Sequence, residues 1–268
     1  MGKFTGLLLA SDYDNTLTYT AEALRLCAPM PPVSDVNQAA LRHFMAEGGV
    51  FSVATGRAKP AFEVVAHGVP MNGPTILFNG AAIYDFAAGR YLYTAFLPDI
   101  VRTHIAQTLR ALPFAAVELY HDDNSIHALQ PNEVTRRHLH VTHSPTVIVD
   151  SMAQVPSPIS KALFSTEPSD QAALLGVFSG KTLLEMTAKG ANKGGMVQRL
   201  AALLDIPQDR VICVGDHAND VSMLTWAGAA FAPANALPEV LALPCVHALP
   251  DCRENAIAAL IALLDEKH

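Results

Sequence analysis

"GLLLASDYDNTLT", residues 6–18, places two acidic residues directly after a short apolar run. A run of this length without polar alternation is typical of a strand buried on both faces of a parallel sheet. Residues two apart in an extended segment point the same way, so Asp12 and Asp14 face one side together while Tyr13 points elsewhere. Taken alone, the pair is weak evidence for a site, because acids that follow a strand often cap the next helix.

Three further apolar runs have the same form, namely "GVFSVA", "PTILF" and "RVICV". Each of the four runs stops at a polar residue: Asp12, Thr55, Asn79 and Asp216. Helical patterns such as "VNQAALRHFMAEGG" and "KGGMVQRLAALLD" lie between the runs. This alternation predicts an α/β fold with a doubly wound, Rossmann-like parallel sheet. Because ligands bind beyond the carboxyl ends of such strands, the four polar stops should converge on one crevice.

The middle of the chain has a different pattern and predicts a second domain. It begins like a hairpin, continues with a helix from Pro98 to Ala111, and contains the strand candidates "FAAVELY", "TVIVD", "ISKALFST" and "KTLLEMT". We therefore expect a catalytic core formed by residues 1–82 plus 187–268, interrupted by an inserted α+β cap at 83–186.

Composition narrows the class of partner. The formal net charge is -7 and no Lys/Arg-rich run is present, which argues against nucleic acid or an anionic membrane as the main partner. No apolar run reaches transmembrane length, and "MGKFTGLLLASD" is too short in its apolar part for a signal peptide. We expect a cytoplasmic protein with a small-molecule ligand and no obligate protein partner.

A second acidic cluster follows another apolar run: "VGDHANDVSML" supplies Asp216, Asn219 and Asp220. Two acidic strand ends in one crevice would repel each other without a cation. Carboxylate and carbonyl oxygens suit Mg²⁺, whose coordination is usually completed by water and substrate phosphate. The sequence therefore predicts a magnesium site.

A carboxylate beside Mg²⁺ can attack phosphorus and form an aspartyl-phosphate. A second carboxyl group can then protonate the leaving oxygen and later activate water. The phosphoryl oxygens also need fixed donors and positive charge, which Thr55 in "ATGR" and Lys193 in "GANKGG" could provide.

The motifs "DYDNTL", "SVATGR", "KGANKGG" and "GDHANDVSML", in this order and spacing, resemble those of the haloacid-dehalogenase (HAD) superfamily, in particular its Cof-like sugar phosphatases. The resemblance implies that Asp12 is the nucleophile and Asp14 the general acid/base. It implies metal ligation by Asp12, Asp216 and the backbone carbonyl of Asp14. The other implied positions are the phosphate-binding residues Thr55, Gly56, Lys193, Asn79 and Gly80, and the supporting residues Asn219, Asp220, Arg57 and Asn235.

The chain departs from the family pattern at three places. Asn15 stands where Gly usually follows the second Asp, and Asn tolerates the left-handed backbone region better than most residues. Ala234 replaces the usual Gly before the "NA" element, and "ENA" stands where an acidic-Gly pair is expected near the C-terminus. These departures concern the subfamily and leave the core chemistry in place.

Several residues have competing interpretations. Lys189 is an alternative to Lys193, although spacing favours Lys193. The segment "HDDNSIH" could bind a metal through His121, Asp122, Asp123 and His127, but a polar hairpin tip explains it as well. The segment "RRHLHVTH" is either a site for an anionic substrate or a solvated basic face, and Trp226 is either a sugar platform or a core residue.

We therefore predict a Mg²⁺-dependent phosphatase that hydrolyses a small phosphorylated metabolite, such as a sugar phosphate, through an aspartyl-phosphate. A sugar phosphomutase or phosphotransferase on the same scaffold is an alternative. A phosphate-ligand-binding protein without turnover is another, which the intact Asp12 and Asp14 disfavour.

Overall fold

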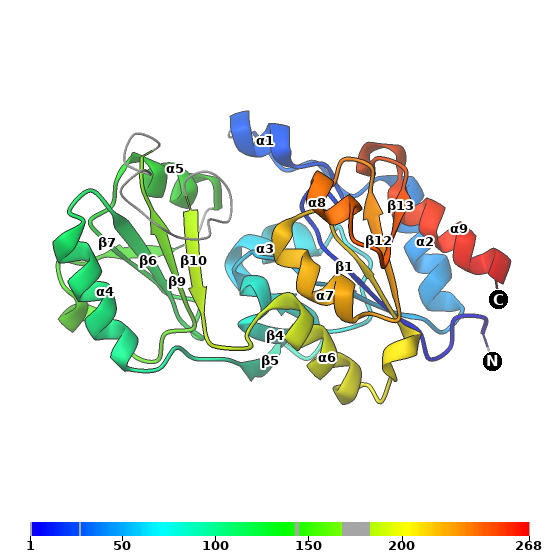
Figure 1. Cartoon of the computed structure of the whole chain (residues 1–268), viewed down its shortest axis with the longest axis horizontal. Coiled ribbons are helices and arrows are strands. Elements are labelled where there is room, and N and C mark those ends of the chain that lie inside the picture. Colours follow the sequence, from blue (N-terminus) through cyan, green and yellow to red (C-terminus); the bar gives the residue numbers. More distant parts are fainter. Residues whose placement is uncertain (1, 27, 143–144, 168–182, 268) are drawn as a thin grey trace. The chain divides into compact units, whose positions relative to one another are not determined.

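The computed structural model describes residues 2–26, 28–142, 145–167 and 183–267. The chain forms two compact units. Unit 1 contains residues 1–57, 63–93 and 192–268, and unit 2 contains residues 58–62 and 94–191. Figure 1 shows the order of the elements along the chain. Within the described residues, no helix is both long and apolar enough to cross a membrane.

The centre of unit 1 is a five-stranded parallel sheet in the order β13-β12-β11-β1-β2. Its strands are β1 (Leu8–Ser11), β2 (Val50–Val53), β11 (Val211–Val214), β12 (Ala229–Pro233) and β13 (Val246–Leu249). The apolar strand β1 lies between β2 and β11 and is completely buried. This arrangement confirms the predicted doubly wound α/β sheet.

Helices cover both faces of this sheet. The described helices of unit 1 are α1 (Ala21–Leu26), which has no buried residue, α2 (Asp35–Ala46), α3 (Lys59–Ala66), α6 (Lys193–Leu203), α7 (Val221–Trp226), α8 (Pro238–Leu241) and α9 (Ala256–Lys267), with α3 divided between the two units. Figure 1 shows α6 and α7 on one side of the sheet and α2 and α9 on the other. The α2 helix begins where the Ser34 side chain accepts a hydrogen bond from the Asn37 amide, a typical N-cap.

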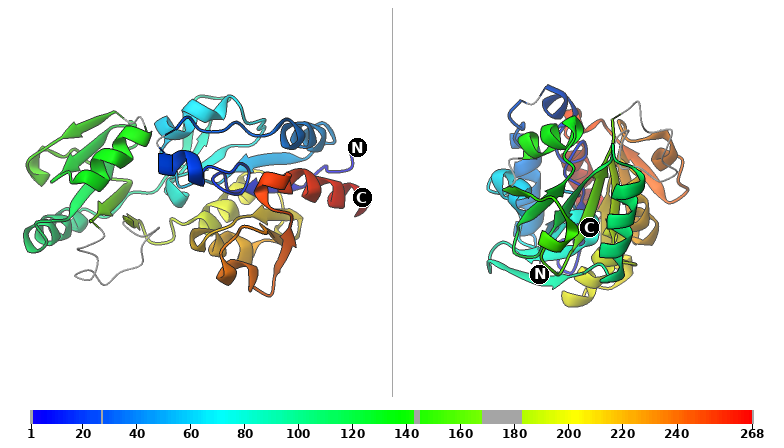
Figure 2. Two further views of the ribbon diagram at one scale, coloured as in Figure 1. Left: turned by 90° about the horizontal axis from the view of Figure 1, so that it is seen from above. Right: turned by 90° about the vertical axis from the view of Figure 1, so that its left-hand side faces the viewer.

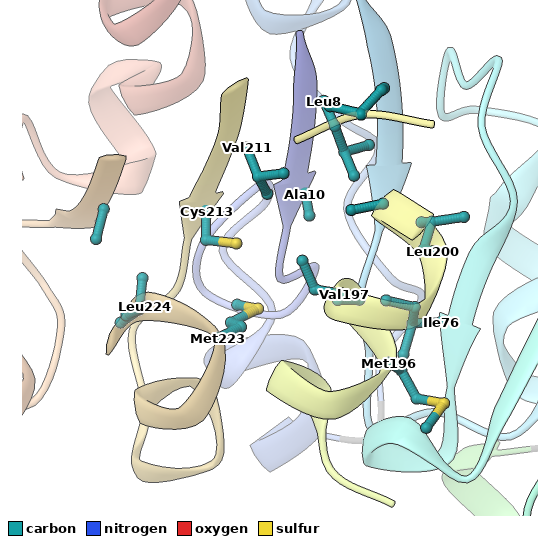
Figure 3. Packing of buried hydrophobic residues seen from close by; sticks show 14 of the residues in the cluster. Leu8, Ala10, Ile76, Met196, Val197, Leu200, Val211, Cys213, Met223 and Leu224 are labelled. Atoms are coloured by element: carbon teal, nitrogen blue, oxygen red, sulfur yellow. The ribbon is translucent and has the colours of Figure 1, made fainter. Parts of the chain in front are cut away.

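The hydrophobic core of unit 1 lies between α6, α7 and the sheet (Figure 3). Leu8 and Ala10 of β1 alternate with residues of the opposite face, and they meet Val197 and Leu200 of α6. This packing fixes the N-terminal end of α6 against the carboxyl ends of β1 and β11. Trp226 packs against the same cluster, which favours the core interpretation of this residue.

One predicted strand has a different partner from the one expected. "PTILF" forms β3 (Thr75–Leu77), which begins a separate three-stranded sheet with β4 (Ala82–Asp85) and β5 (Arg90–Thr94). A single bridge between Ala54 and Ile76 joins β3 to the chain after β2. Because β4 and β5 continue this sheet, unit 1 extends to residue 93, whereas the sequence pattern placed the boundary at 82. On the C-terminal side, unit 1 resumes at residue 192, where the sequence placed it at 187.

Unit 2 contains a mixed five-stranded sheet in the order β10-β9-β6-β7-β8. The strands are β6 (Ala116–Tyr120), β7 (Ile126–Leu129), β8 (Thr146–Ile148), β9 (Lys161–Ser165) and β10 (Leu183–Thr187), and the helices are α4 (Ile100–Ala111) and α5 (Glu133–Thr142). Figure 2 shows α4 along one face of this sheet, where Ile105 and Leu109 pack against Val117 and Leu119. The first residues of the candidate "KTLLEMT" lie outside the described residues.

Candidate active site

The two acidic strand ends meet in unit 1. Asp12 follows β1, and Asp216 lies two residues beyond the neighbouring strand β11. The Asp12 amide donates a hydrogen bond to the carbonyl oxygen of Val214, 2.9 Å away, which continues the parallel pairing into the loop. Carboxylate oxygens of Asp12, Asp216 and Asp220 lie within 4.8 Å of one another, and all three residues are buried. Convergence of the acidic strand ends is thus what the sequence pattern predicts.

Lys193 is the first residue of α6 and reaches into this acidic cluster. Its Nζ lies 2.5 Å from Asp12 Oδ1 and 2.6 Å from Asp220 Oδ1, and the residue is 1% exposed. The helix begins at this point because the side chain of Asn192 caps it, accepting from the Gly195 amide. Lys189, the competing lysine, is exposed.

Asp220 is held in place by the backbone. Its Oδ2 accepts hydrogen bonds from the amides of Asp216 and His217, each 3.0 Å long. Gly215 leaves room for this carboxylate, because a Cβ atom at Gly215 would lie 2.5 Å from Asp220 Cγ. Asp220 therefore has both oxygens engaged, one by the backbone and one by Lys193.

The charges in this cluster do not balance. Three buried carboxylates face one buried ammonium group. Burial raises the pKa of Asp12 well above its usual value, and Asp220, Asp216 and Asp14 add to the rise while Lys193 opposes it. Burial and then Asp220 raise the pKa of Asp216 to about 6. Burial alone would lower the pKa of Lys193, but Asp12 and Asp220 outweigh it and the pKa is raised.

The residues of the cluster fit a divalent cation, because their negative charge exceeds their positive charge. Lys193 binds Asp12 through Oδ1, and Thr16 donates to Asp216 Oδ1 over 3.0 Å. Each of these two carboxylates has a second oxygen, so the site combines hard oxygen donors with uncompensated charge, which fits Mg²⁺.

Asp14 lies outside the three-carboxylate group. Arg57 donates from Nε to Asp14 Oδ2 over 2.9 Å and from a terminal nitrogen to Oδ1 over 2.7 Å. Thr20 donates to the same Oδ1 over 2.6 Å. The Arg57 guanidinium also lies over the Tyr13 ring, 5.2 Å from its centroid. Asp14 is thereby oriented by a two-point contact, and Arg57 has a defined partner.

The loop after β2 lies beside the "FNG" turn. The Asn79 amide donates to the Thr55 carbonyl oxygen over 3.0 Å, and a Cβ atom at Gly56 would lie 2.9 Å from Asn79 Oδ1. Asn219 joins this group by donating from Nδ2 to Asn79 Oδ1 over 2.8 Å, while its own buried Oδ1 has no hydrogen-bond partner in the described part of the chain. Gly80 has a φ of 102° and packs directly on the Asn192 backbone, where a Cβ would clash.

Asn235 supports the first acidic loop instead of contacting the carboxylate cluster. Its Nδ2 donates to the Asn15 carbonyl oxygen over 2.7 Å, and its Oδ1 accepts from the Cys252 amide. Asn15 has a φ of 60°, in the left-handed region, as its place in the Gly position of the motif predicts. Its side chain accepts from the amides of Thr20 and Ala21 and so caps α1.

Two residues that the sequence analysis left out contribute to the site. Thr16 holds Asp216, and Thr20 holds Asp14. Both lie within or just after the "DYDNTL" motif, but no pattern in the sequence identifies their partners.

The two polar segments of unit 2 that the sequence singles out have different surroundings. His138 lies on α5 with Nδ1 2.9 Å from the buried Glu118, and Arg136 pairs with Glu133 on the same helix. These contacts give two basic residues of "RRHLHVTH" carboxylate partners within unit 2, and the choice between an anion site and a solvated basic face stays a prediction. His121 and His127 lie close together, with ring centroids 5.0 Å apart.

Comparison with known proteins identifies the family of this chain. The family model described as haloacid dehalogenase-like hydrolase matches residues 9–261. The HMP-PP phosphatase of Yersinia enterocolitica is 25% identical over 236 residues, which cover 82% of this chain and 84% of that protein.

Solved structures share the fold. A haloacid dehalogenase-like hydrolase from Bacteroides thetaiotaomicron aligns with a TM-score of 0.78 at 20% identity, covering 96% of this chain and 99% of that one. BT4131, described as a sugar phosphatase of HAD subclass IIB, aligns with a TM-score of 0.77 at 19% identity, covering 97% and 99%.

Proposed function

The chain belongs to the haloacid dehalogenase-like hydrolase family and is a phosphatase of that family, and on this premise we propose that it is Mg²⁺-dependent and hydrolyses a small phosphorylated metabolite through an aspartyl-phosphate. The observation that carries the proposal is the buried contact of Lys193 with Asp12 and Asp220 at adjoining strand ends. The names of the relatives, an HMP-PP phosphatase and a sugar phosphatase, support a small phosphorylated substrate such as a sugar phosphate.

In the first step, a carboxylate oxygen of Asp12 attacks phosphorus, and the bond between phosphorus and the substrate oxygen breaks. The leaving oxygen takes a proton from Asp14, which Arg57 and Thr20 orient. In the second step, Asp14 removes a proton from water as the water attacks the phosphorus of the aspartyl-phosphate, which frees Asp12 and releases inorganic phosphate.

Lys193 has two functions in this scheme. It neutralises part of the charge around Asp12 before the reaction, and its ammonium group is available to the phosphoryl oxygens during the transfer. Asp220 keeps Lys193 in position, since its other oxygen is fixed by two backbone amides. Thr55, Gly56, Asn79 and Gly80 are proposed to bind the phosphate on the side of the second motif.

Asp12, Asp216 and the backbone carbonyl of Asp14 are proposed to hold the Mg²⁺ ion. When bound, this ion supplies positive charge to the phosphoryl group as negative charge develops on its oxygens. The three buried carboxylates with a single buried ammonium group support this assignment.

The test is phosphate release from a panel of sugar, nucleotide and cofactor phosphates plus p-nitrophenyl phosphate, with Mg²⁺ and with EDTA. We expect release that needs Mg²⁺ and that is lost in Asp12→Asn. The exposed Asp205, which adopts a left-handed conformation that Asn also tolerates, provides the matched control Asp205→Asn.

Two results would contradict the proposal. A well-folded Asp12→Asn variant with normal turnover would refute the covalent mechanism. An isomerised sugar phosphate without free phosphate would instead identify a phosphomutase, and binding without turnover would identify a ligand-binding protein.

A further inference from the structure

Unit 2 contains two histidines at one end of its sheet, on the hairpin formed by β6 and β7 (Figure 1). His127 pairs with Leu119 across the hairpin, and His121 lies two residues beyond Leu119. Residues two apart in an extended strand share a face, so both imidazoles project from the same face of the sheet. Their rings are 5.0 Å apart and almost perpendicular, at 89°.

His121 has a buried ring nitrogen without a partner. The residue is 3% exposed, and its Nδ1 lies 2.7 Å from the carbonyl oxygen of Pro158. A carbonyl oxygen can only accept, so Nδ1 carries the hydrogen and the neutral ring presents a lone pair at Nε2. No hydrogen bond from a described residue reaches Nε2, although the atom is buried. A buried polar atom of this kind is uncommon in folded proteins and requires an explanation.

Two more unpartnered polar atoms belong to the same end of the sheet. Among the residues that the structure describes, neither the buried His127 Nδ1 nor the buried Ser160 Oγ has a hydrogen-bond partner. The ladder pairs Tyr120 with Lys161, so one further step places Ser160 opposite His121 on the same face. Burial and the neighbouring His121 lower the pKa of His127, which favours the neutral imidazole.

The arrangement matches the requirements of a metal ion bound by imidazole. With metal–nitrogen bonds of about 2.0–2.1 Å and a tetrahedral angle, two imidazoles on one ion have centroids about 5 Å apart. A histidine that binds a metal usually donates its other N–H to a backbone carbonyl, as His121 does to Pro158. Simple edge-to-face packing of two rings would explain the angle but would leave both buried nitrogens unsatisfied.

We propose that His121 Nε2 and His127 Nδ1 form a second metal site, selective for a divalent ion such as Zn²⁺. Water completes the coordination. The nitrogen ligands distinguish this site from the oxygen cluster of unit 1, which suits Mg²⁺. Among the described residues, three metal-binding groups come together only at Asp12, Asp216 and Asp220, so the histidine site relies on two protein ligands and water.

The proposed ion has a structural function. It joins the two strands of the β6–β7 hairpin, and the hydrogen bond from His121 to Pro158 fixes this pair of strands to the segment that leads into β9. The proposal does not depend on the phosphatase chemistry of unit 1.

The experiment is a calorimetric titration of the tag-free, full-length protein with Zn²⁺ in an excess of Mg²⁺. It is repeated with the Asp216→Asn variant to remove binding at the oxygen cluster. We expect one Zn²⁺ equivalent that survives Asp216→Asn and whose Kd rises at least about tenfold in His127→Gln and in His121→Ala. His104→Ala, which alters an exposed histidine on α4 of the same unit, is the matched control and should bind as the wild type does.

A Co²⁺ titration gives a second readout, because histidine ligation produces visible absorption that activity does not influence. His127 is partly exposed, so His127→Gln keeps the test informative even if the buried substitution His121→Ala prevents folding. Equal Zn²⁺ binding by the wild type and a folded His127→Gln variant would refute the proposal, as would the absence of any Zn²⁺ equivalent beyond the oxygen cluster.

Discussion

Replacing Lys193 by Met should destabilise unit 1 most strongly at alkaline pH in the absence of metal. The substitution keeps most of the side chain's length and removes the ammonium group that contacts Asp12 and Asp220. Breaking a buried ion pair by removing one partner typically costs about 3–5 kcal/mol, because the remaining charge is buried without compensation. We expect a loss of that size in the free energy of unfolding at pH 8 with EDTA.

The loss should be smaller at pH 5. The pKa of Asp216 is raised to about 6 in the folded protein, above its value in the unfolded chain, so its contribution to stability is present at low pH and disappears as the pH rises through 6. For this group alone, protonation adds about 1.4 kcal/mol between pH 8 and pH 5. Without Lys193 the pKa values of Asp12 and Asp216 rise further, so the variant should gain more stability on acidification than the wild type.

Urea unfolding followed by tryptophan fluorescence can measure this difference. Trp226 is the only tryptophan and packs against the core of unit 1, so its emission reports on the unit that contains the cluster. Lys189→Met, at an exposed position, should change stability by no more than about 0.5 kcal/mol. A cost for Lys193→Met that is equal at pH 5 and pH 8, or that grows on acidification, would show that the electrostatic reasoning is wrong.

Three other substitutions test separate parts of the site. Arg57→Ala should lower kcat on alkyl phosphates by about 100-fold, because Asp14 loses its two-point contact. The loss of kcat on p-nitrophenyl phosphate should be much smaller, because this leaving group needs little protonation. Equal losses on the two kinds of substrate would contradict this reasoning. Asn15→Ala should cost about 1–2 kcal/mol in urea unfolding because φ is 60°, whereas Asn15→Gly should cost less; the reverse order would exclude backbone strain as the cause. Gly215→Ala should lower both thermal stability and kcat by displacing Asp220, and an unchanged kcat would show that Asp220 tolerates the shift.

Sequence reasoning succeeded where the physics is local or periodic. Strands β1, β2 and β11 are buried in the sheet, so each consists of a short apolar run. Parallel pairing then brings together the polar residues that follow these strands. The left-handed backbone at Asn15 was also predictable, because few residues other than Gly and Asn adopt it easily.

It was less successful where the outcome depends on a distant partner. The apolar run of β3 does not reveal whether it extends the parallel sheet or starts another. Arg57 is separated from Asp14 by 43 residues, and nothing in either segment identifies the pair. Strand β7 was missed because His127 interrupts its apolar pattern, although the structure places one of its ring nitrogens in a buried position.

The central position of β1 also has a consequence for synthesis on the ribosome. Leu8 pairs with Val50 on one side and with Val211 on the other, so the second neighbour of this strand is translated roughly 200 residues after it. At about 5–20 residues per second, the N-terminal strand waits about 10–40 s for that neighbour. The whole of the 94–191 segment is translated during this interval and can fold first. The nascent chain thus carries Asp12, the proposed nucleophile, for most of its synthesis without Lys193 or Asp220, and the buried cluster can form only near the end of translation.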